Sequence, residues 1–159
     1  PIEKHFIGQI QSRKIKRVVE LFDVIQSVGS IEHLQRIEKE ALAQDKSIKV
    51  LLQFNISGEV QKGGFDKSEM GNIEKAISKI RGVKIIGVMG MASQASDEEV
   101  VRKQFRLLKS IRDELRAIYP TTGELSMGMS DDYKIALEEG STVLRIGRAL
   151  FSNTHSLPA

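Results

Sequence analysis

Short apolar runs alternate with longer amphipathic stretches along all 159 residues of the chain. Apolar runs of this length indicate buried strands, whereas apolar positions three and four residues apart indicate helices that bury one face. The pattern predicts strands over residues 5–8, 23–28, 48–56, 83–91, 123–127 and 142–146. It predicts helices over residues 11–20, 30–45, 66–81, 97–119 and 131–139, and a short helix from residue 148.

Several helix ends carry signals of their own. Ser30 and Asp97 precede helical stretches, where a side-chain oxygen can accept a free backbone N–H. Glu98 and Glu99 then stabilise the positive end of the helix that follows Asp97. Pro120 is expected to close that helix, because proline has no amide hydrogen to continue the ladder.

The order of these elements restricts the fold class. The central strands are apolar on both faces, as in a parallel sheet covered by helices, and strict alternation with helices is typical of an open doubly wound sheet or a barrel. An open sheet commonly carries a glycine-rich first turn, which residues 5–12 match poorly. We therefore predict an α/β protein of the (β/α)8, TIM-barrel type, with about six of the eight βα units in this chain. At about 30 residues a unit, roughly 60 to 80 residues would precede Pro1.

Composition excludes several classes of function. With 40% apolar and 28% charged residues, residues 1–159 are expected to form a single globular domain. Aromatic residues are only 5% of the chain, which argues against a stacking platform for nucleic acid. The dense basic run over residues 13–17 is interpreted as a solvated helix face. The absence of cysteine excludes disulfides and fits a cytoplasmic location. The apolar runs are all shorter than the roughly 18 residues that a membrane span needs, which argues against such a span.

Two segments near the C-terminus, residues 125–132 (LSMGMSDD) and 140–147 (GSTVLRIG), each join a predicted strand to a predicted helix. Such junctions bind phosphate, because free N–H groups and the positive helix end point at the anion. We predict that the Ser126 hydroxyl and the backbone amides of Gly147 and Arg148 bind a phosphate group.

Ser130 is the rival phosphate ligand in the first of these segments. Asp131 and Asp132 are expected in the first turn of the following helix, where they would repel a phosphate dianion. Ser130 is therefore interpreted as the cap of that helix.

Four further residues are candidates for contacts with a cofactor. Arg145 would be held on a rigid strand beside the phosphate, or would instead pair with a carboxylate at the end of the barrel. Asn55 ends an apolar strand and either faces the site or caps the next turn. Met89 packs in the core or beneath a cofactor ring, and His5 is a buried residue or a site residue. His33 and His155 lack partners at metal-ligand spacing, so no metal site is expected.

Five segments of the chain carry a further signal when they are taken together: HFIGQIQSRK (5–14), LLQFNISGEVQKGGF (51–65), IIGVMGM (85–91), ELSMGMSDD (124–132) and GSTVLRIGRALF (140–151). They resemble the YggS/PROSC family of pyridoxal-phosphate homeostasis proteins, which have an alanine-racemase-like barrel. The resemblance implies that the chain is the C-terminal part of such a barrel and binds pyridoxal 5′-phosphate through Arg145, which would face the pyridine nitrogen. Arg13 and Arg148 depart from the family pattern, which usually has Asn and Thr there.

The resemblance also implies that the Schiff-base lysine of the family lies in an N-terminal segment before this chain, so the catalytic residues stay unassigned. Lys49 and Lys84 lie at strand starts, away from the mouth of the barrel, and Lys62 lies on a loop that would position it poorly. The resemblance implies a carrier or regulator in vitamin B6 homeostasis, and we expect no strong catalysis from it.

Two alternatives stay open. One is a pyridoxal-phosphate-dependent amino-acid racemase or lyase, which needs a lysine at a strand mouth and, for racemisation, an acid or base that alanine racemase takes from a further C-terminal domain. The other is a fragment with an empty phosphate site. In each case we expect a small-molecule ligand, no nucleic-acid or membrane partner, and a monomer or weak homodimer.

Overall fold

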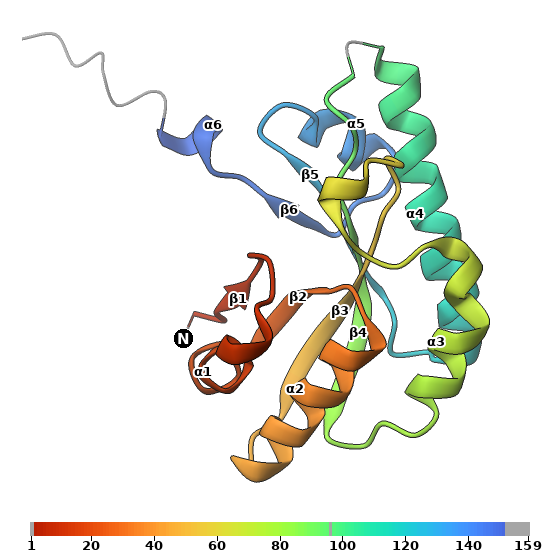
Figure 1. Cartoon of the computed structure of the whole chain (residues 1–159). Helices are drawn as coiled ribbons and strands as arrows, with labels where there is room; N and C mark the ends of the chain where they lie inside the picture. The colour runs from red at the N-terminus through yellow and green to blue at the C-terminus, as the bar shows by residue number, and fades with distance from the viewer. Residues whose placement is uncertain (1, 96, 152–159) are drawn as a thin grey trace, which may run out of the picture.

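Six parallel strands form one sheet in which the spatial order of the strands is their order in the chain. The computed structural model describes residues 2–95 and 97–151. The strands are β1 His5–Phe6, β2 Val24–Val28, β3 Ile48–Phe54, β4 Val83–Gly90, β5 Glu124–Met129 and β6 Val143–Arg145. All six predicted strands are confirmed. A doubly wound sheet would reverse its order at a switch point, so the sequential order confirms a barrel-type sheet, here curled and open (Figure 1).

The helices follow the strands as predicted, with shorter bounds at several ends. They are α1 Ile15–Leu21, α2 Ile31–Ala43, α3 Met70–Ile77, α4 Glu98–Ile118, α5 Tyr133–Glu138 and α6 Arg148–Phe151. Residues 12–14 and 67–69 form short 3-10 turns that precede α1 and α3, which accounts for the later starts of these two helices.

Two predicted helix caps are confirmed. The Ser30 hydroxyl accepts the His33 N–H at 3.1 Å at the start of α2. The Asp97 carboxylate accepts the Glu99 N–H at 2.9 Å at the start of α4. Each bond satisfies a backbone donor that the helix itself leaves free.

The main apolar core lies between the outer face of the sheet and the helices that cover it (Figure 1). In α4 the buried residues recur every three or four positions, and Phe105 and Leu108 are among the fully buried ones. The inner face carries a smaller cluster of Val24, Leu51 and Met89. The middle strands are therefore buried on both faces, as their continuous apolar sequences predict.

Strands β1 and β6 are the two edges of the sheet, and each pairs with one neighbour among the described residues. The adjacent strand β2 is buried along its whole length, including its two polar residues, Gln26 and Ser27. The Ser27 hydroxyl donates to the Gly8 carbonyl at 2.6 Å, which ties the segment after β1 to β2. Figure 1 shows β1 and β6 on the same side of the molecule, away from α3 and α4.

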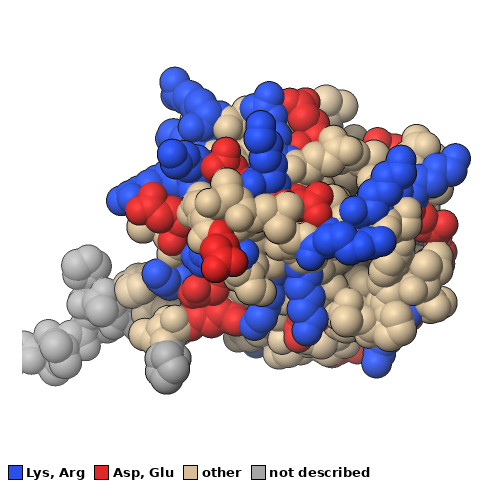
Figure 2. All heavy atoms as spheres, turned by 90° about the horizontal axis from the view of Figure 1, so that it is seen from below, with Lys and Arg blue, Asp and Glu red and all other residues tan. Residues whose placement is uncertain are grey.

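The charged surface is mixed in sign. The basic residues of the run at 13–17 are all exposed, on α1 and the turn before it, which confirms a solvated face. Figure 2 shows basic and acidic side chains interspersed over the face seen from below. Among the helices of the described residues, none has the length and apolar character that crossing a membrane requires.

A carboxylate–arginine cluster joins α4 to the end of α5. Glu139, directly after α5, accepts from Arg102 Nη1 at 2.9 Å and from Arg106 Nε at 3.0 Å. The hydrogen bonds from Arg106 and Arg102 hold the pKa of Glu139 below its ordinary value of 4.5. The ionised carboxylate therefore stabilises the folded state.

We expect Glu139→Gln to lower the free energy of unfolding by about 1 kcal/mol at neutral pH. A carboxyl group with a lowered folded pKa stabilises the protein above its unfolded pKa, and this contribution is lost as the pH falls through the folded pKa. Urea unfolding of both proteins between pH 7 and about pH 3 should show the difference shrinking below pH 4.5. A difference that stays constant with pH would contradict this role. Glu138→Gln, at the exposed neighbour, is the matched control.

Candidate functional site

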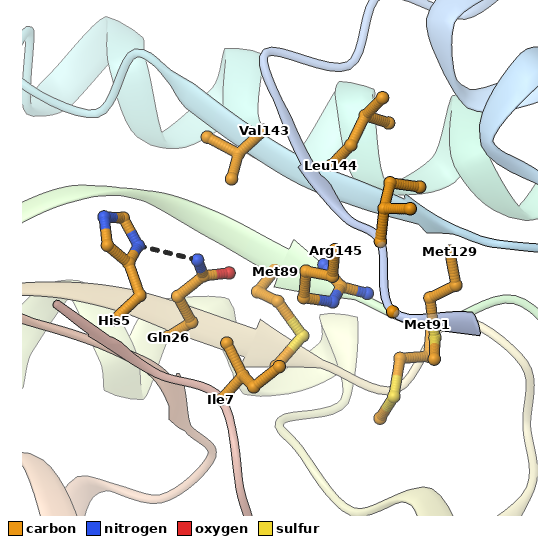
Figure 3. A pocket seen from close by; sticks show the side chains of 11 residues that line it. His5, Ile7, Gln26, Met89, Met91, Met129, Val143, Leu144 and Arg145 are labelled. Atoms are coloured by element: carbon orange, nitrogen blue, oxygen red, sulfur yellow. Dashed lines mark hydrogen bonds between the residues drawn. The ribbon is translucent and has the colours of Figure 1, made fainter. Parts of the chain in front are cut away.

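A pocket of about 600 Å3 lies between the two edge strands, toward the carboxyl ends of the strands (Figure 3). Its volume is within the roughly 300–1,000 Å3 of small-molecule sites, and its position is that of active sites in barrel proteins. The lining residues are His5, Ile7, Gln26, Met89, Met91, Met129, Val143, Leu144, Arg145, Ile146 and Gly147. Four of the predicted site residues are therefore brought together.

Arg145, the last residue of β6, provides the positive charge of the pocket. Its Nη1 donates to Ser126 Oγ at 2.7 Å and its Nη2 donates to the Gly90 carbonyl at 2.9 Å. Burial lowers the pKa of Arg145 to about 10, which leaves it a cation at neutral pH. Among the described residues no carboxylate forms an ion pair with it, so the alternative of a carboxylate-paired arginine is not observed in this part of the chain.

Ser126 lies under Arg145, fully buried, and it is the third residue of β5. Its hydroxyl donates to Gln26 Oε1 at 2.5 Å and accepts from Arg145. The predicted strand end at residue 127 is too early, because β5 continues to Met129, which pairs with Arg145 of β6. The hydroxyl proton is thus donated within the protein, and a phosphate contact from Ser126 stays a prediction.

Gly147 lies at the rim of the pocket, immediately before α6. A Cβ atom at Gly147 would meet no atom within 4 Å, so the space around this residue is open to a ligand. The Arg148 side chain is exposed and forms an ion pair with Asp131. Arg148 does not line the pocket, and a phosphate contact from its backbone amide stays a prediction.

The loop between β5 and α5 differs from the prediction. The helix begins at Tyr133 with Asp132 at the N-cap position, so Ser130 is not its cap and Asp131 is not in its first turn. The Asp132 carboxylate instead accepts the Met129 N–H at 2.7 Å. The helix starts two residues late because this side-chain bond closes a turn at the end of β5.

Asn55 does not line the pocket. Its Nδ2 donates to the Glu59 carbonyl at 3.0 Å, and its Oδ1 accepts the Gly58 N–H at 3.1 Å. The alternative that Asn55 caps the turn after β3 is therefore confirmed. Met89 packs in the inner cluster with Val24 and Leu51, as predicted, and it also lines the pocket; a place beneath a cofactor ring stays a prediction.

His5 and Gln26 form the wall of the pocket on the β1 side (Figure 3). Gln26 Nε2 lies 2.8 Å from His5 Nδ1, and His5 Nε2 lies 3.0 Å from a Glu3 carboxylate oxygen. Hydrogen bonds from Lys49 and His5 hold the pKa of Glu3 below its ordinary value. The sequence analysis did not predict Gln26 as a residue of the pocket. A glutamine inside the otherwise apolar segment VIQSV could have indicated a buried polar contact.

None of the lysines singled out in the sequence reaches the pocket. Lys62 donates to the Ala92 carbonyl at 2.6 Å and pairs with Glu59, and Lys49 pairs with Glu3. The residues that line the pocket include no lysine. Within the described ranges, no group of three or more His, Cys, Asp or Glu side chains could hold a metal ion, and His155 lies outside those ranges.

The chain is similar to several known proteins. Residues 3–154 match the family described as "Alanine racemase, N-terminal domain". The pyridoxal phosphate homeostasis protein of Vibrio alginolyticus is 37% identical over 150 residues, which are 94% of this chain and 64% of that relative. This chain thus spans somewhat less than two thirds of that protein.

Solved structures show the same likeness. PipY of Synechococcus elongatus matches 94% of this chain both without pyridoxal phosphate (TM-score 0.89, 32% identity, 71% of PipY) and with it bound (TM-score 0.85, 30% identity, 70% of PipY). Alanine racemase of Clostridium difficile matches 98% of this chain with a TM-score of 0.81, over 41% of its own length. At 15% identity, that likeness concerns the fold alone.

Proposed function

The chain belongs to the pyridoxal phosphate homeostasis proteins of the alanine racemase N-terminal domain family, and on this basis we propose that it binds pyridoxal 5′-phosphate reversibly in the pocket beside Arg145. We propose that it acts as a carrier or regulator of this cofactor. The observation that carries the proposal is a partly buried guanidinium inside a pocket of about 600 Å3, with no carboxylate of the described residues at ion-pair distance and only the longer-range charge of Asp132 to favour its cationic form.

The side chains of the pocket fit the chemistry of this cofactor. A guanidinium can only donate hydrogen bonds, and removing its charge from water is costly unless an acceptor or an anion offsets it. Pyridoxal 5′-phosphate offers a ring nitrogen as an acceptor and a phosphate dianion. Met89 and Met91 provide adaptable apolar surface for a flat ring, and the open rim at Gly147 leaves room for a phosphate at backbone amides.

Arg145 also determines how reactive the site would be. When bound, the cofactor supplies an aldehyde and an electron-withdrawing pyridine ring. Because Arg145 stays protonated, donation from it to the ring nitrogen disfavours a proton there, which weakens the ring as an electron sink. Among the described residues that line the pocket there is no lysine, which supports reversible binding by residues 1–159. Both features support a carrier rather than a strong catalyst.

Titration of residues 1–159 with pyridoxal 5′-phosphate, followed by absorbance, tests the proposal. We expect saturable binding that dialysis reverses, and no stoichiometric mass increase after borohydride reduction. Pyridoxal without its phosphate is the matched control ligand and should bind more weakly. Absence of saturable binding would contradict the proposed function, and a stoichiometric adduct at one lysine would favour the enzyme alternative.

We further propose that the chain works in the cytoplasm as a monomer or weak homodimer that uses a small-molecule ligand rather than nucleic acid. A sequence of 159 residues without cysteine suits a reducing compartment. A small-molecule ligand rather than nucleic acid is supported by the face in Figure 2, where basic and acidic side chains are interspersed. Nucleic-acid sites, in contrast, gather basic residues on one face.

A further inference from the structure

A chain of hydrogen bonds runs beside the pocket from Arg145 of β6 to Glu3, in the segment before β1. The chemistry of its donors and acceptors allows the chain one direction. Arg145 can only donate, so Ser126 Oγ accepts from it at 2.7 Å. The hydroxyl proton of Ser126 therefore points to Gln26 Oε1, 2.5 Å away. Gln26 is thereby fixed with its oxygen toward Ser126 and its NH2 group toward His5.

The direction continues through His5. The Gln26 NH2 group lies 2.8 Å from His5 Nδ1, so Nδ1 must accept. A neutral His5 then carries its proton on Nε2, which lies 3.0 Å from the Glu3 carboxylate. Reversing the Gln26 amide would take away the acceptor of the Ser126 proton and place an oxygen against His5 Nδ1, which carries no proton in the neutral tautomer that donates to Glu3. One orientation of Gln26 therefore satisfies every member of the chain.

We propose that Gln26 is a positioning residue, which holds the Ser126 hydroxyl as an acceptor for Arg145 and so presents the guanidinium to the ligand of the pocket. This inference rests on the proposed function, because the ligand is pyridoxal 5′-phosphate. Gln26 acts through Ser126: it is 2% exposed, and its amide oxygen and NH2 group are each bonded within the protein. The hydrogen bond between Gln26 and Ser126 joins residues 100 positions apart in the sequence. These residues lie on β2 and β5, which are not neighbours in the sheet.

The first test is a double-mutant cycle on the affinity for pyridoxal 5′-phosphate. Gln26→Met keeps the length of the side chain and removes both hydrogen bonds, and we expect it to raise the Kd by about five- to twenty-fold. Because Gln26 acts through Ser126, the pair Gln26→Met with Ser126→Ala should bind no more weakly than the weaker single variant. Additive losses, or an unchanged Kd for Gln26→Met, would overturn the proposal.

Gln53→Met is the matched control for the same titration. Gln53 is also a buried strand glutamine with an internal bond, from its Nε2 to the Lys62 carbonyl at 2.8 Å, but it does not line the pocket. Its substitution should leave the Kd within about two-fold of the wild type. A loss equal to that of Gln26→Met would show a general effect on the sheet and would count against a positioning role.

The second test needs neither ligand nor variant. Nitrogen-15 NMR of the wild-type chain at mildly alkaline pH reports which ring nitrogen of His5 carries the proton. We expect protonated Nε2 and unprotonated Nδ1, and the opposite tautomer would overturn the proposed direction of the chain. If Gln26→Met does not fold, this measurement still tests the direction of the hydrogen-bond chain on which the proposal depends. If the wild type binds no pyridoxal 5′-phosphate, the proposed function fails, whereas the tautomer of His5 reports separately whether Gln26 has the inferred orientation.

Discussion

The Arg145→Gln variant is expected to bind pyridoxal 5′-phosphate more weakly by on the order of 1.5–3 kcal/mol, which is roughly a 10- to 150-fold rise in Kd. Glutamine keeps one NH2 group as a donor, but it removes the permanent charge and one of the two hydrogen bonds that the guanidinium donates through Nη1 and Nη2. In this structure those two bonds run to Ser126 Oγ and to the Gly90 carbonyl, so the variant also loosens the contact between β6 and β4. Titration followed by absorbance measures the change.

Arg17→Gln is the matched control for this variant. Arg17 is exposed on α1 and pairs with Glu20, away from the pocket, so its loss removes the same formal charge without touching the site. Its Kd should equal that of the wild type. Equal affinity of Arg145→Gln and the wild type, with both proteins folded by circular dichroism, would remove Arg145 from the binding site.

The second large effect is on stability, at Gly87, where β4 and β5 lie close together. A Cβ atom at Gly87 would lie 2.2 Å from the Glu124 carbonyl oxygen and 2.6 Å from the Glu124 Cβ. Gly87 and Glu124 are also paired in register, so relief of this overlap must move one strand relative to the other. We expect Gly87→Ala to lower the free energy of unfolding by about 1–3 kcal/mol or more, measured by urea denaturation.

Gly71→Ala provides the contrast, because the chemical change is the same. Gly71 lies in α3, and a Cβ atom there would meet nothing within 4 Å. Alanine is the better helix former, so this variant should be as stable as the wild type or more stable by up to about 1 kcal/mol. Similar losses at Gly87 and Gly71 would contradict the steric explanation.

The elements of this fold were predictable because their signals are local. The apolar runs gave all six strands, and Ser30 and Asp97 marked two helix starts through bonds that span three and two residues. Strict alternation of strands and helices left a doubly wound sheet and a barrel open, and the poor match of residues 5–12 to a glycine-rich first turn favoured the barrel-type order that the structure shows. The length of β5 could not be predicted from the local pattern, because it depends on the pairing of Met129 with Arg145 in the last strand.

The site was predictable in part for the same reason. Arg145 and Gly147 lie two residues apart, so one strand end brings both to the pocket. Asn55 was left undecided between the pocket and the next turn, and the bonds within its own loop decide this. The bond between Gln26 and Ser126 joins residues 100 positions apart, and no local pattern encodes such a partner.

A crystal structure of residues 1–159 with pyridoxal 5′-phosphate bound tests the central claim most directly. We expect electron density for the cofactor between β1 and β6, with its ring nitrogen at hydrogen-bond distance from the Arg145 guanidinium and its phosphate near the Gly147 amide. Density for the cofactor at any other place on the protein, with this pocket filled by solvent, would contradict the account.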